Sequence, residues 1–279
     1  MNFDIPKNNK EQTLVYKVIG ERKIALTFLP PIKEIYKLSP VYFIIPGGGW
    51  HEESRESMLD FSALSVQSLR CAGFAAVSID YRVSDEQGVT MEEIISDCFD
   101  AARYISHFSE ILKIDPDKFV VSGHSAGGHL SLMLAYAPHD MFISDSVLSD
   151  DFSVAVAAPM SAPTILYTEN IEPTLGLNAD HAFRGNNTYE TRKKTSPYTY
   201  VSYKSPPTVL CAGTSDRLVY CNSSELLYKK LIENKVKCKL VLSVGGGHCF
   251  EKMHDGIIPS PSREEIQEII TSFIKKSLS

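Results

Sequence analysis

The sequence predicts an α/β fold built around a mostly parallel β-sheet, and three observations support this. Short, continuously apolar runs recur along the chain and alternate with segments of helical periodicity. Strands that alternate with helices of this length are typical of βαβ units with right-handed crossovers. The chain has 279 residues, enough to bury a sizeable core, and neither an internal repeat nor a linker divides it. We therefore expect one domain over residues 1–279, with helices flanking the central sheet.

The strands follow from apolar runs between turn residues. Residues 13–19 and 23–29 have β-type patterns and are separated by Gly20-Glu21, which predicts an antiparallel hairpin at the amino-terminal end. Residues 41–45 are apolar throughout, as in a strand that is buried on both faces of a parallel sheet. By the same criteria further strands are expected at 75–80, 119–121, 154–158, 208–212 and 239–244.

The helices follow from apolar residues at helical spacing. Residues 58–71 show this spacing and precede Gly73, a plausible C-cap. The same periodicity predicts helices at 91–108, 129–136, 222–233 and 264–275. Residues 161–203 differ, being rich in Asn, Thr, Tyr and Pro and poor in periodicity. They are too long for a bare connection, so we expect a small cap or insertion over one end of the sheet.

Composition excludes several classes of protein. A net charge of −6 and a pI near 5.8 argue against binding to nucleic acid or to a membrane surface. The first residues have no apolar run typical of an export signal, and no stretch reaches the ~18 apolar residues of a transmembrane helix. The six cysteines show no CxxC pairing and are expected to be reduced. A cytoplasmic location is therefore expected, and no motif indicates a metal or cofactor.

Ser125 is the first candidate for chemistry. It lies at the centre of the pentapeptide GHSAG, between a β-branched run and a helix-compatible run. Glycines two residues before and two residues after the serine let a strand turn sharply into a helix, because the backbones can approach without Cβ atoms. The context predicts an exposed nucleophile, whereas the plain alternative is a small residue in a turn.

A serine nucleophile needs a base and a carboxylate that orients the base. His248 follows a predicted strand through three glycines, and Asp216 follows the strand before it, so both lie at strand carboxyl ends. We expect Asp216 to orient His248 and His248 to deprotonate Ser125, although Asp216 could instead cap a helix. His254 and Asp255 are the weaker competitors for these two roles.

Backbone amides for an oxyanion are expected from two places. The run PGGGW at 46–50 follows an early central strand, and its glycines leave the amides unobstructed. The amide of Ala126, next to the serine, is a further donor. A glycine triplet could also be no more than a tight loop.

Five motifs together resemble the α/β-hydrolase superfamily. They are PGGGW at 46–50, DYR at 80–82, GHSAGG at 123–128, SPPTVLCAGTSD at 205–216 and GGGHCF at 245–250. The chain resembles the esterase/lipase branch with an HGGG-type loop, and is most similar to small bacterial carboxylesterases and acetyl xylan esterases of the feruloyl and acetyl esterase kind. The match runs from about residue 13 to the carboxyl terminus. Pro46 replaces the usual histidine of HGGG, which speaks against the hormone-sensitive-lipase-like subgroup and is shared with xylan-esterase-like relatives.

The resemblance implies Ser125 as nucleophile, Asp216 as orienting carboxylate and His248 as base, with Gly48, Gly49 and Ala126 as oxyanion donors. It further implies hydrolysis of short, acetyl-type esters, with acetylated sugars or xylo-oligosaccharides as expected substrates and no cofactor. An amidase or arylformamidase is the alternative, because Trp50 follows a similar glycine loop in arylformamidases, and a non-catalytic small-molecule binder is the more distant one. Aromatic residues expected to line the substrate pocket are Trp50, Tyr167, Phe183 and Tyr198.

Overall fold

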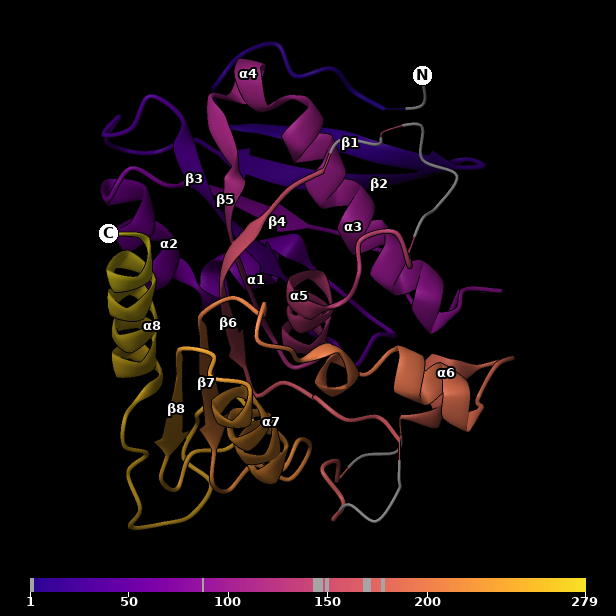
Figure 1. Ribbon diagram of the computed structural model, residues 1–279, viewed down its shortest axis with the longest axis vertical. Coiled ribbons are helices and arrows are strands. Elements are labelled where there is room, and N and C mark those ends of the chain that lie inside the picture. The colour runs from indigo at the N-terminus through magenta and orange to yellow at the C-terminus, as the bar shows by residue number, and fades with distance from the viewer. Residues whose placement is uncertain (1–2, 87, 143–147, 149–150, 168–171, 177–178) are drawn as a thin grey trace.

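The computed structural model describes residues 3–86, 88–142, 148, 151–167, 172–176 and 179–279. Within these residues, eight strands form one sheet in the order β1, β2, β4, β3, β5, β6, β7, β8 (Figure 1). The strands are β1 (Gln12–Ile19), β2 (Arg22–Leu29), β3 (Ser39–Ile45), β4 (Ala75–Ile79), β5 (Ile114–His124), β6 (Val154–Met160), β7 (Thr208–Gly213) and β8 (Cys238–Ser243).

The sheet is mostly parallel, as the sequence predicts. β3 pairs in parallel with β4 and β5, and β5, β6, β7 and β8 continue the parallel pairing. β1 and β2 form the predicted antiparallel hairpin, which joins the sheet through antiparallel pairing of β2 with β4. The carboxyl ends of the six parallel strands therefore meet at one edge of the sheet, where ligands bind in folds of this type.

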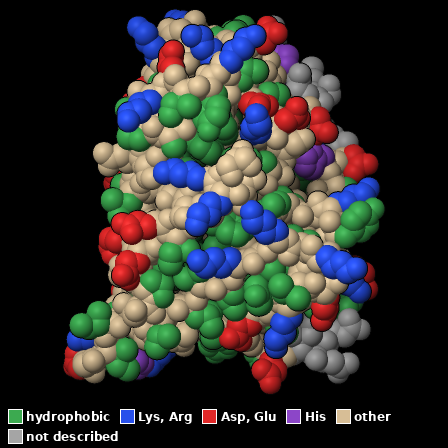
Figure 2. Space-filling view, turned by 60° about the vertical axis from the view of Figure 1, so that its left-hand side comes forward, with side chains coloured by type: hydrophobic (Ala, Val, Ile, Leu, Met, Phe, Trp, Pro, Cys, Tyr) green, Lys and Arg blue, Asp and Glu red, His purple; other side chains and the backbone are tan. Residues whose placement is uncertain are grey.

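Helices cover both faces of the sheet. α1, α2 and α8 pack on one face, and α3, α5 and α7 pack on the other. Figure 2 turns the side of α2 and α8 toward the viewer, where Lys and Arg side chains lie between small groups of apolar ones. The helices are α1 (Arg55–Phe61), α2 (Ala63–Cys71), α3 (Met91–His107), α4 (Ser109–Leu112), α5 (Ala126–Tyr136), α6 (Tyr189–Lys194), α7 (Asn222–Glu233) and α8 (Arg263–Leu278), with 3₁₀ turns η1 (Asp180–Phe183) and η2 (Pro197–Tyr200).

Alternation along β3 explains why its residues 41–45 are apolar throughout. Val41, Phe43 and Ile45 pack with α3 and α5, whereas Tyr42 and Ile44 pack with α1, α2 and α8. All five side chains are fully buried. Successive side chains of a strand point to opposite faces, so a strand between two helical layers has no exposed position. This burial holds the end of β3, and the glycine loop after it, in a fixed place.

The predicted helix at 58–71 is divided into α1 and α2 at Ser62. A side chain from the far end of the chain causes the division: the amide oxygen of Gln267 accepts from the backbone N–H of Ser65 at 3.0 Å, and its amide nitrogen donates to the carbonyl of Phe61 at 3.0 Å. Gln267 thus stands between the two groups that would form one helical hydrogen bond. A side chain inserted into a helix in this way bends it.

The segment 161–203 contains η1, α6 and η2 among its described residues. η1 reaches the glycine loop, because a ring nitrogen of His181 lies 2.8 Å from the carbonyl oxygen of Gly49. That this segment is a cap within a single domain over residues 1–279 stays a prediction. Among the described residues, no helix has the length and apolar character needed to cross a membrane.

Candidate active site

Ser125 lies at the turn between β5 and α5. Its backbone has φ +56° and ψ −121°, a conformation that L residues rarely adopt. The Ser125 N–H donates to the carbonyl of Met160 at 2.9 Å, which holds the turn against the end of β6. A strained residue that its surroundings hold in place is typical of functional sites. The geometry is that of the nucleophile turn expected for this motif.

The steric role predicted for the glycines around Ser125 is confirmed. A Cβ added to Gly127 would lie 2.0 Å from the carbonyl oxygen of Ile45, and one added to Gly123 would lie 2.4 Å from the backbone of Gly127. Real Cβ atoms do not approach backbone this closely. Only glycine at these positions therefore allows β3, β5 and α5 to meet at the serine.

The glycine loop after β3 packs directly against this turn. A Cβ on Gly47 would lie 2.8 Å from the carbonyl oxygen of His124 and 3.3 Å from Cβ of Ser125. Gly48 and Gly49 have φ of +117° and +61°. Within the described residues, the amides of Gly48, Gly49 and Ala126 donate no hydrogen bond. That these amides stabilise an oxyanion stays a prediction, with which their lack of an acceptor agrees.

Asp216 and His248 are brought together at the ends of β7 and β8. Oδ2 of Asp216 lies 2.7 Å from Nδ1 of His248. The other carboxylate oxygen of Asp216 accepts from the backbone N–H groups of Leu218 at 2.8 Å and Val219 at 3.0 Å. The Asp216 side chain is fully buried, while that of His248 is 14% exposed. The capping alternative for Asp216 is wrong, because the next helix, α7, begins at Asn222 with Cys221 as its N-cap. The second oxygen of Asp216 instead holds the turn at Leu218 and Val219.

The competing residues lie elsewhere. Asp255 is exposed and pairs with Lys252 at 3.4 Å, and His254 is also exposed.

In the described part of the chain, the Ser125 hydroxyl makes no hydrogen bond to His248. Hydrogen bonds between a nucleophile and its base are often long or poorly aligned in structures without substrate. The missing bond is therefore compatible with Ser125 as nucleophile and His248 as base.

Two side chains that sequence reasoning did not assign hold the backbone of His248. Nε2 of His124 lies 2.8 Å from the carbonyl oxygen of His248, and Oγ of Ser161 donates to the same oxygen at 2.8 Å. Ser161 follows the last residue of β6 and has φ +46°. The sequence carries no signal for these contacts, because they join residues more than 80 positions apart.

Burial controls the protonation of His124. Its removal from water, together with the nearby charge of His248, lowers the pKa of His124 to about 4. The ring lies between those of Phe61 and His248, with centroid distances of 4.7 Å to each. His124 is thus a neutral imidazole at physiological pH.

Trp50, the last residue of the glycine loop, has its side chain buried in the core. Its indole is 1% exposed, and Nε1 donates to Nδ1 of His129 at 3.2 Å. The other nitrogen of His129 lies 2.6 Å from the carbonyl oxygen of Thr195, which follows α6. Burial lowers the pKa of His129 to about 4, so this ring is also neutral. Trp50 links the loop to α5 and packs in the core, and its buried indole gives no support to the substrate contact expected for it.

The other aromatic residues expected at the pocket pack against side chains of the segment 161–203 or of α7. Tyr167 contacts Tyr189 edge to face at 5.5 Å. The ring of Tyr198 lies 4.0 Å from Nζ of Lys230, and the buried ring of Phe183 lies 4.4 Å from the guanidinium of Arg192. Their roles at a substrate pocket stay predictions, since no contact with Ser125 or His248 supports them.

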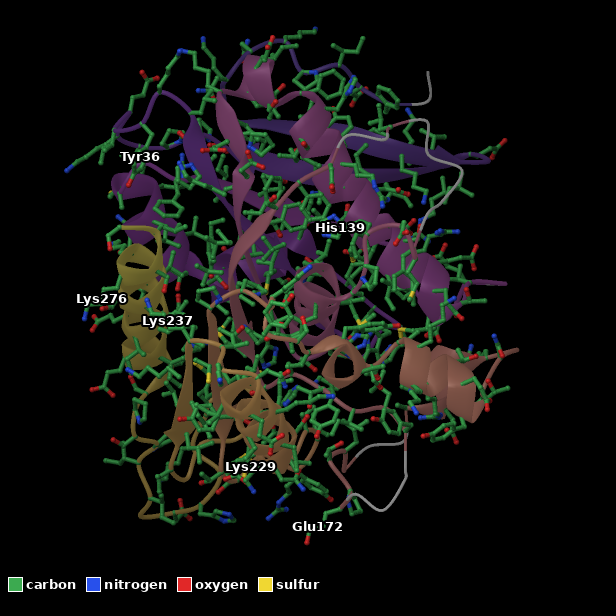
Figure 3. The ribbon with its side chains drawn as sticks, viewed as in Figure 1. Tyr36, His139, Glu172, Lys229, Lys237 and Lys276 are labelled. Atoms are coloured by element: carbon green, nitrogen blue, oxygen red, sulfur yellow. The ribbon has the colours of Figure 1, made fainter. Side chains whose placement is uncertain are left out.

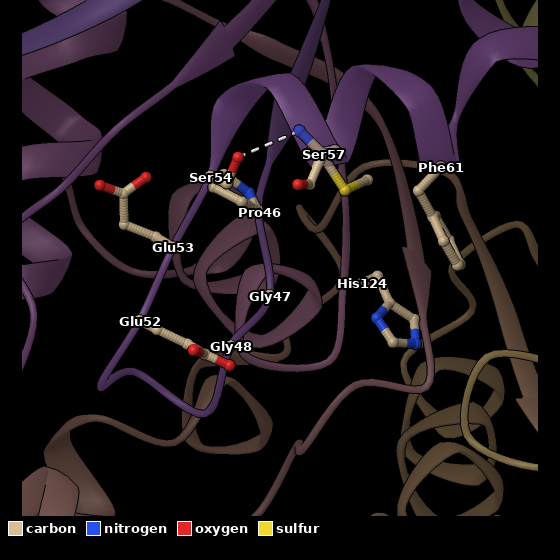
Figure 4. A pocket seen from close by; sticks show the side chains of 10 residues that line it. Pro46, Gly47, Gly48, Glu52, Glu53, Ser54, Ser57, Phe61 and His124 are labelled. Atoms are coloured by element: carbon tan, nitrogen blue, oxygen red, sulfur yellow. Dashed lines mark hydrogen bonds between the residues drawn. The ribbon is translucent and has the colours of Figure 1, made fainter.

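A cavity of about 350 Å³ adjoins the serine turn on the side of α1 (Figure 4). Gly47, Gly48 and His124 line it, and a ring nitrogen of His124 points toward Gly47, where an added Cβ would lie 3.3 Å from Cβ of Ser125. The remaining lining combines apolar and polar side chains: Pro46, Met58, Phe61, Glu52, Glu53, Ser54 and Ser57. The cavity can therefore contact both hydroxyl and apolar groups of a small molecule.

Glu53 is the unusual acid of this cavity. Burial and the neighbouring carboxylate of Asp80 raise the pKa of Glu53 to about 8, and the guanidinium groups of Arg22 and Arg55 oppose this rise. Oε2 of Glu53 is buried and has no hydrogen-bond partner among the described residues. Glu53 is thus largely protonated at neutral pH.

Comparison with known proteins places the chain in a family. The profile of the BD-FAE family matches residues 28–231. The probable carboxylic ester hydrolase LipM of Mycobacterium tuberculosis is 29% identical over 195 residues, which cover 68% of this chain and 44% of that protein. The carboxylesterase NlhH of the same organism is 25% identical, over 62% of this chain and 52% of its own length. The chain thus spans about half the length of these two relatives. It is also 28% identical over 144 residues to a non-reducing polyketide synthase of Stereocaulon alpinum, a match that covers 49% of this chain and 6% of that protein.

Solved structures show the same fold. Esterase 2 of Thermogutta terrifontis superposes with a TM-score of 0.79 at 24% identity, over 97% of this chain and 94% of that one. The same enzyme phosphoramylated by tabun superposes with a TM-score of 0.78 at 22% identity, over 97% and 96% of the two chains. The match of the family profile and the shared architecture agree with the resemblance drawn from the motifs. The chain belongs to the BD-FAE family, within the esterase/lipase group of α/β-hydrolases.

Proposed function

We propose that the chain is a serine carboxylesterase that uses Ser125 as nucleophile, His248 as base and Asp216 as orienting carboxylate. The hydrogen bond of 2.7 Å between Asp216 and His248 carries this proposal. It joins the two residue types that activate a serine, at strand ends next to a strained serine turn. The names of the relatives, probable carboxylic ester hydrolase for LipM and carboxylesterase for NlhH, support the same reaction class.

In the proposed reaction, Nε2 of His248 takes the hydroxyl proton of Ser125 while Oγ bonds to the carbonyl carbon of the ester. The electron pair of the carbonyl moves to its oxygen, and the amides of Gly48, Gly49 and Ala126 stabilise that negative charge. When the carbonyl reforms, the bond to the alcohol breaks and the alcohol takes the proton from His248. Water then repeats these steps on the acyl-enzyme, releasing the acid and restoring Ser125.

Asp216 supports this cycle and stays ionised throughout it. By accepting from Nδ1, its carboxylate fixes the tautomer in which Nε2 of His248 carries the lone pair. Two backbone N–H groups fix the carboxylate in turn. The imidazolium that forms during the reaction is therefore stabilised by a buried negative charge that does not need to move.

We further propose short acyl groups, acetyl above all, on a sugar or oligosaccharide alcohol. The mixed lining of the cavity beside Ser125 supports this: Glu52, Ser54 and Ser57 offer partners for sugar hydroxyls, and Met58 and Phe61 offer apolar contacts. Carboxylate and hydroxyl oxygens can accept hydrogen bonds from sugar hydroxyls, and the Phe61 ring offers apolar contact area. The amidase alternative depends on Trp50, which is buried in the core and is not among the residues that line the cavity.

Two substrate series test the proposal. The purified chain is assayed on p-nitrophenyl esters of two, four and eight carbons, and on p-nitroacetanilide as the matched amide. Release of acetate from acetylated xylo-oligosaccharides is measured beside them. Highest kcat/KM on the acetyl ester, with acetate released from the oligosaccharide, supports the proposal. Preference for the eight-carbon ester would contradict the short acyl group, and preference for the anilide would favour an amidase.

A further inference from the structure

The carbonyl oxygen of His248 is the meeting point of two buried donors. Nε2 of His124 and Oγ of Ser161 each lie 2.8 Å from it. A carbonyl can only accept, so the contact assigns the proton of the neutral His124 ring to Nε2. His124 is the last residue of β5, and Ser161 directly follows β6, the strand that pairs with β5.

The loop that carries His248 needs such a support. His248 follows Gly245-Gly246-Gly247, and Gly245 has φ +76°. Three glycines in succession give this backbone more conformational freedom than other residues would. The imidazole itself is held at Nδ1 by Asp216. The hydrogen bonds to the carbonyl add a second fixed point, on the main chain of the same residue.

The position of His124 in the chain makes this support specific. His124 immediately precedes Ser125, and its own carbonyl is held close to the glycine loop at Gly47. Its ring is packed between Phe61 and His248, so its donor has little freedom to move. The path from Ser125 to the backbone of His248 therefore consists of one peptide bond, one buried ring and one hydrogen bond.

We propose that His124 is a positioning residue, whose Nε2–H fixes the backbone of His248 relative to Ser125, with Ser161 as the second donor to the same carbonyl. The inference rests on the proposed function in assigning the base to His248. His124 does not touch the reacting atoms. It acts through the placement of His248, where a displacement of about 1 Å is enough to slow a reaction by about 100-fold.

Three variants separate the donor from simple packing. His124→Phe keeps a ring between Phe61 and His248 but removes the donor, whereas His124→Gln keeps an N–H close to the position of Nε2. Ser161→Ala removes the second donor. His139→Phe is the matched control, because its imidazole stacks on Phe152 at 4.4 Å beside α3, in another part of the molecule (Figure 3).

Kinetics on p-nitrophenyl acetate give the first measurement. We expect His124→Phe to lower kcat by about 10- to 100-fold with KM changed less than about 3-fold. We expect the kcat of His124→Gln to be close to that of the parent, and the kcat of Ser161→Ala to lie between those of His124→Phe and His124→Gln. The kcat of His139→Phe should equal that of the parent. Unchanged kcat in His124→Phe overturns the inference. Equal losses in His124→Phe and His124→Gln also overturn it, since they would show that packing and not the donor is responsible.

Hydrogen exchange of residues 245–250, measured by mass spectrometry, tests the same contact without any substrate. The amides of Gly246, Gly247 and Phe250 are hydrogen-bonded within this loop, so a loosened loop exchanges faster. We expect faster exchange in His124→Phe than in His124→Gln or His139→Phe, and equal exchange in all three contradicts the inference. If the parent does not hydrolyse esters, the proposed function fails, whereas the exchange result still decides whether His124 holds the loop.

Discussion

The two carboxylate oxygens of Asp216 have different hydrogen-bond partners, the imidazole of His248 and the backbone of the following turn. Oδ2 lies 2.7 Å from Nδ1 of His248, while Oδ1 accepts from the amides of Leu218 and Val219. The amides hold the carboxylate in the orientation that the imidazole requires. The same side chain therefore stabilises its own loop and orients the proposed base.

Asp216→Asn is expected to keep the fold and to lose most of the activity. The amide can still accept from Leu218 and Val219, but it can present an N–H to His248 and favour the wrong tautomer of the imidazole. We expect kcat on p-nitrophenyl acetate to fall by a factor on the order of 10⁴. Asp255→Asn is the control, because Asp255 is exposed and paired with Lys252. Similar activity in the two variants would show that Asp216 does not orient the base.

Gly127→Ala is expected to destabilise the protein strongly. The added Cβ would lie 2.0 Å from the carbonyl oxygen of Ile45, and this backbone cannot move without displacing β3 from the sheet. Gly185→Ala is the comparison, since its Cβ would meet no atom within 4 Å and only φ +83° opposes it. The cost there is limited to about 1–2 kcal/mol. Urea denaturation of both variants checks the difference, and a smaller loss in Gly127→Ala than in Gly185→Ala would refute the close approach of β3 and α5.

Asp97→Ala is expected to remove a large part of the stability. The buried carboxylate accepts from Nε and Nη2 of Arg82, at 2.8 and 2.9 Å, and from Nζ of Lys17 at 2.6 Å. Removing it takes one carboxylate from each cation, so that Lys17 keeps only Asp100 and Arg82 keeps only the partly exposed Glu93. Breaking a buried ion pair in this way costs up to about 3–5 kcal/mol. Lys118→Met, in the exposed pair with Asp115, should leave the urea midpoint unchanged. An Asp97→Ala midpoint equal to that of the parent would show that water replaces the lost carboxylate.

Glu53 gives a prediction of pH dependence. Its pKa is raised to about 8 by burial and by Asp80, above the value of about 4.3 that an exposed Glu has. The folded state therefore binds a proton that the unfolded state releases between these values. The contribution of protonated Glu53 to the free energy of unfolding is fully present below the pKa of about 4.3 in the unfolded chain. It is lost as pH rises through the folded-state pKa of about 8.

Glu53→Gln should abolish this part of the pH dependence. Free energies of unfolding measured from pH 5 to pH 8 are expected to fall less steeply with rising pH in the variant than in the parent. Asp60→Asn is a suitable control, because Asp60 is an exposed acid of the neighbouring helix α1. Parallel stability curves for parent and Glu53→Gln would mean that Glu53 is ionised in the folded protein.

The parts of the fold that depend on local patterns could be predicted from the sequence. The hairpin of β1 and β2, the buried strand β3 and the helix α7 lie where apolar periodicity and turn residues place them. The glycines around Ser125 likewise fulfil the steric role expected of them. Each of these features depends on neighbours in the chain or on the general geometry of a parallel sheet.

Features that depend on distant contacts could not be predicted. The division of the helix at Ser62 is caused by Gln267, about 200 positions further along the chain. The burial of Trp50 depends on its hydrogen bond with His129, and the support of the His248 carbonyl depends on the ends of two other strands. Periodicity and motif spacing report nothing about such pairs, because their members lie far apart in the chain.

The most direct test of the account is the reaction of Ser125 itself. The parent and Ser125→Ala are assayed on p-nitrophenyl acetate, and both are treated with a fluorophosphonate probe followed by peptide mass spectrometry. We predict that the parent hydrolyses the ester and carries the phosphonyl group on Ser125, and that Ser125→Ala loses activity by a factor on the order of 10⁴ to 10⁶ and takes up no probe. Undiminished hydrolysis by Ser125→Ala, or labelling of the parent at a different residue, would contradict the account.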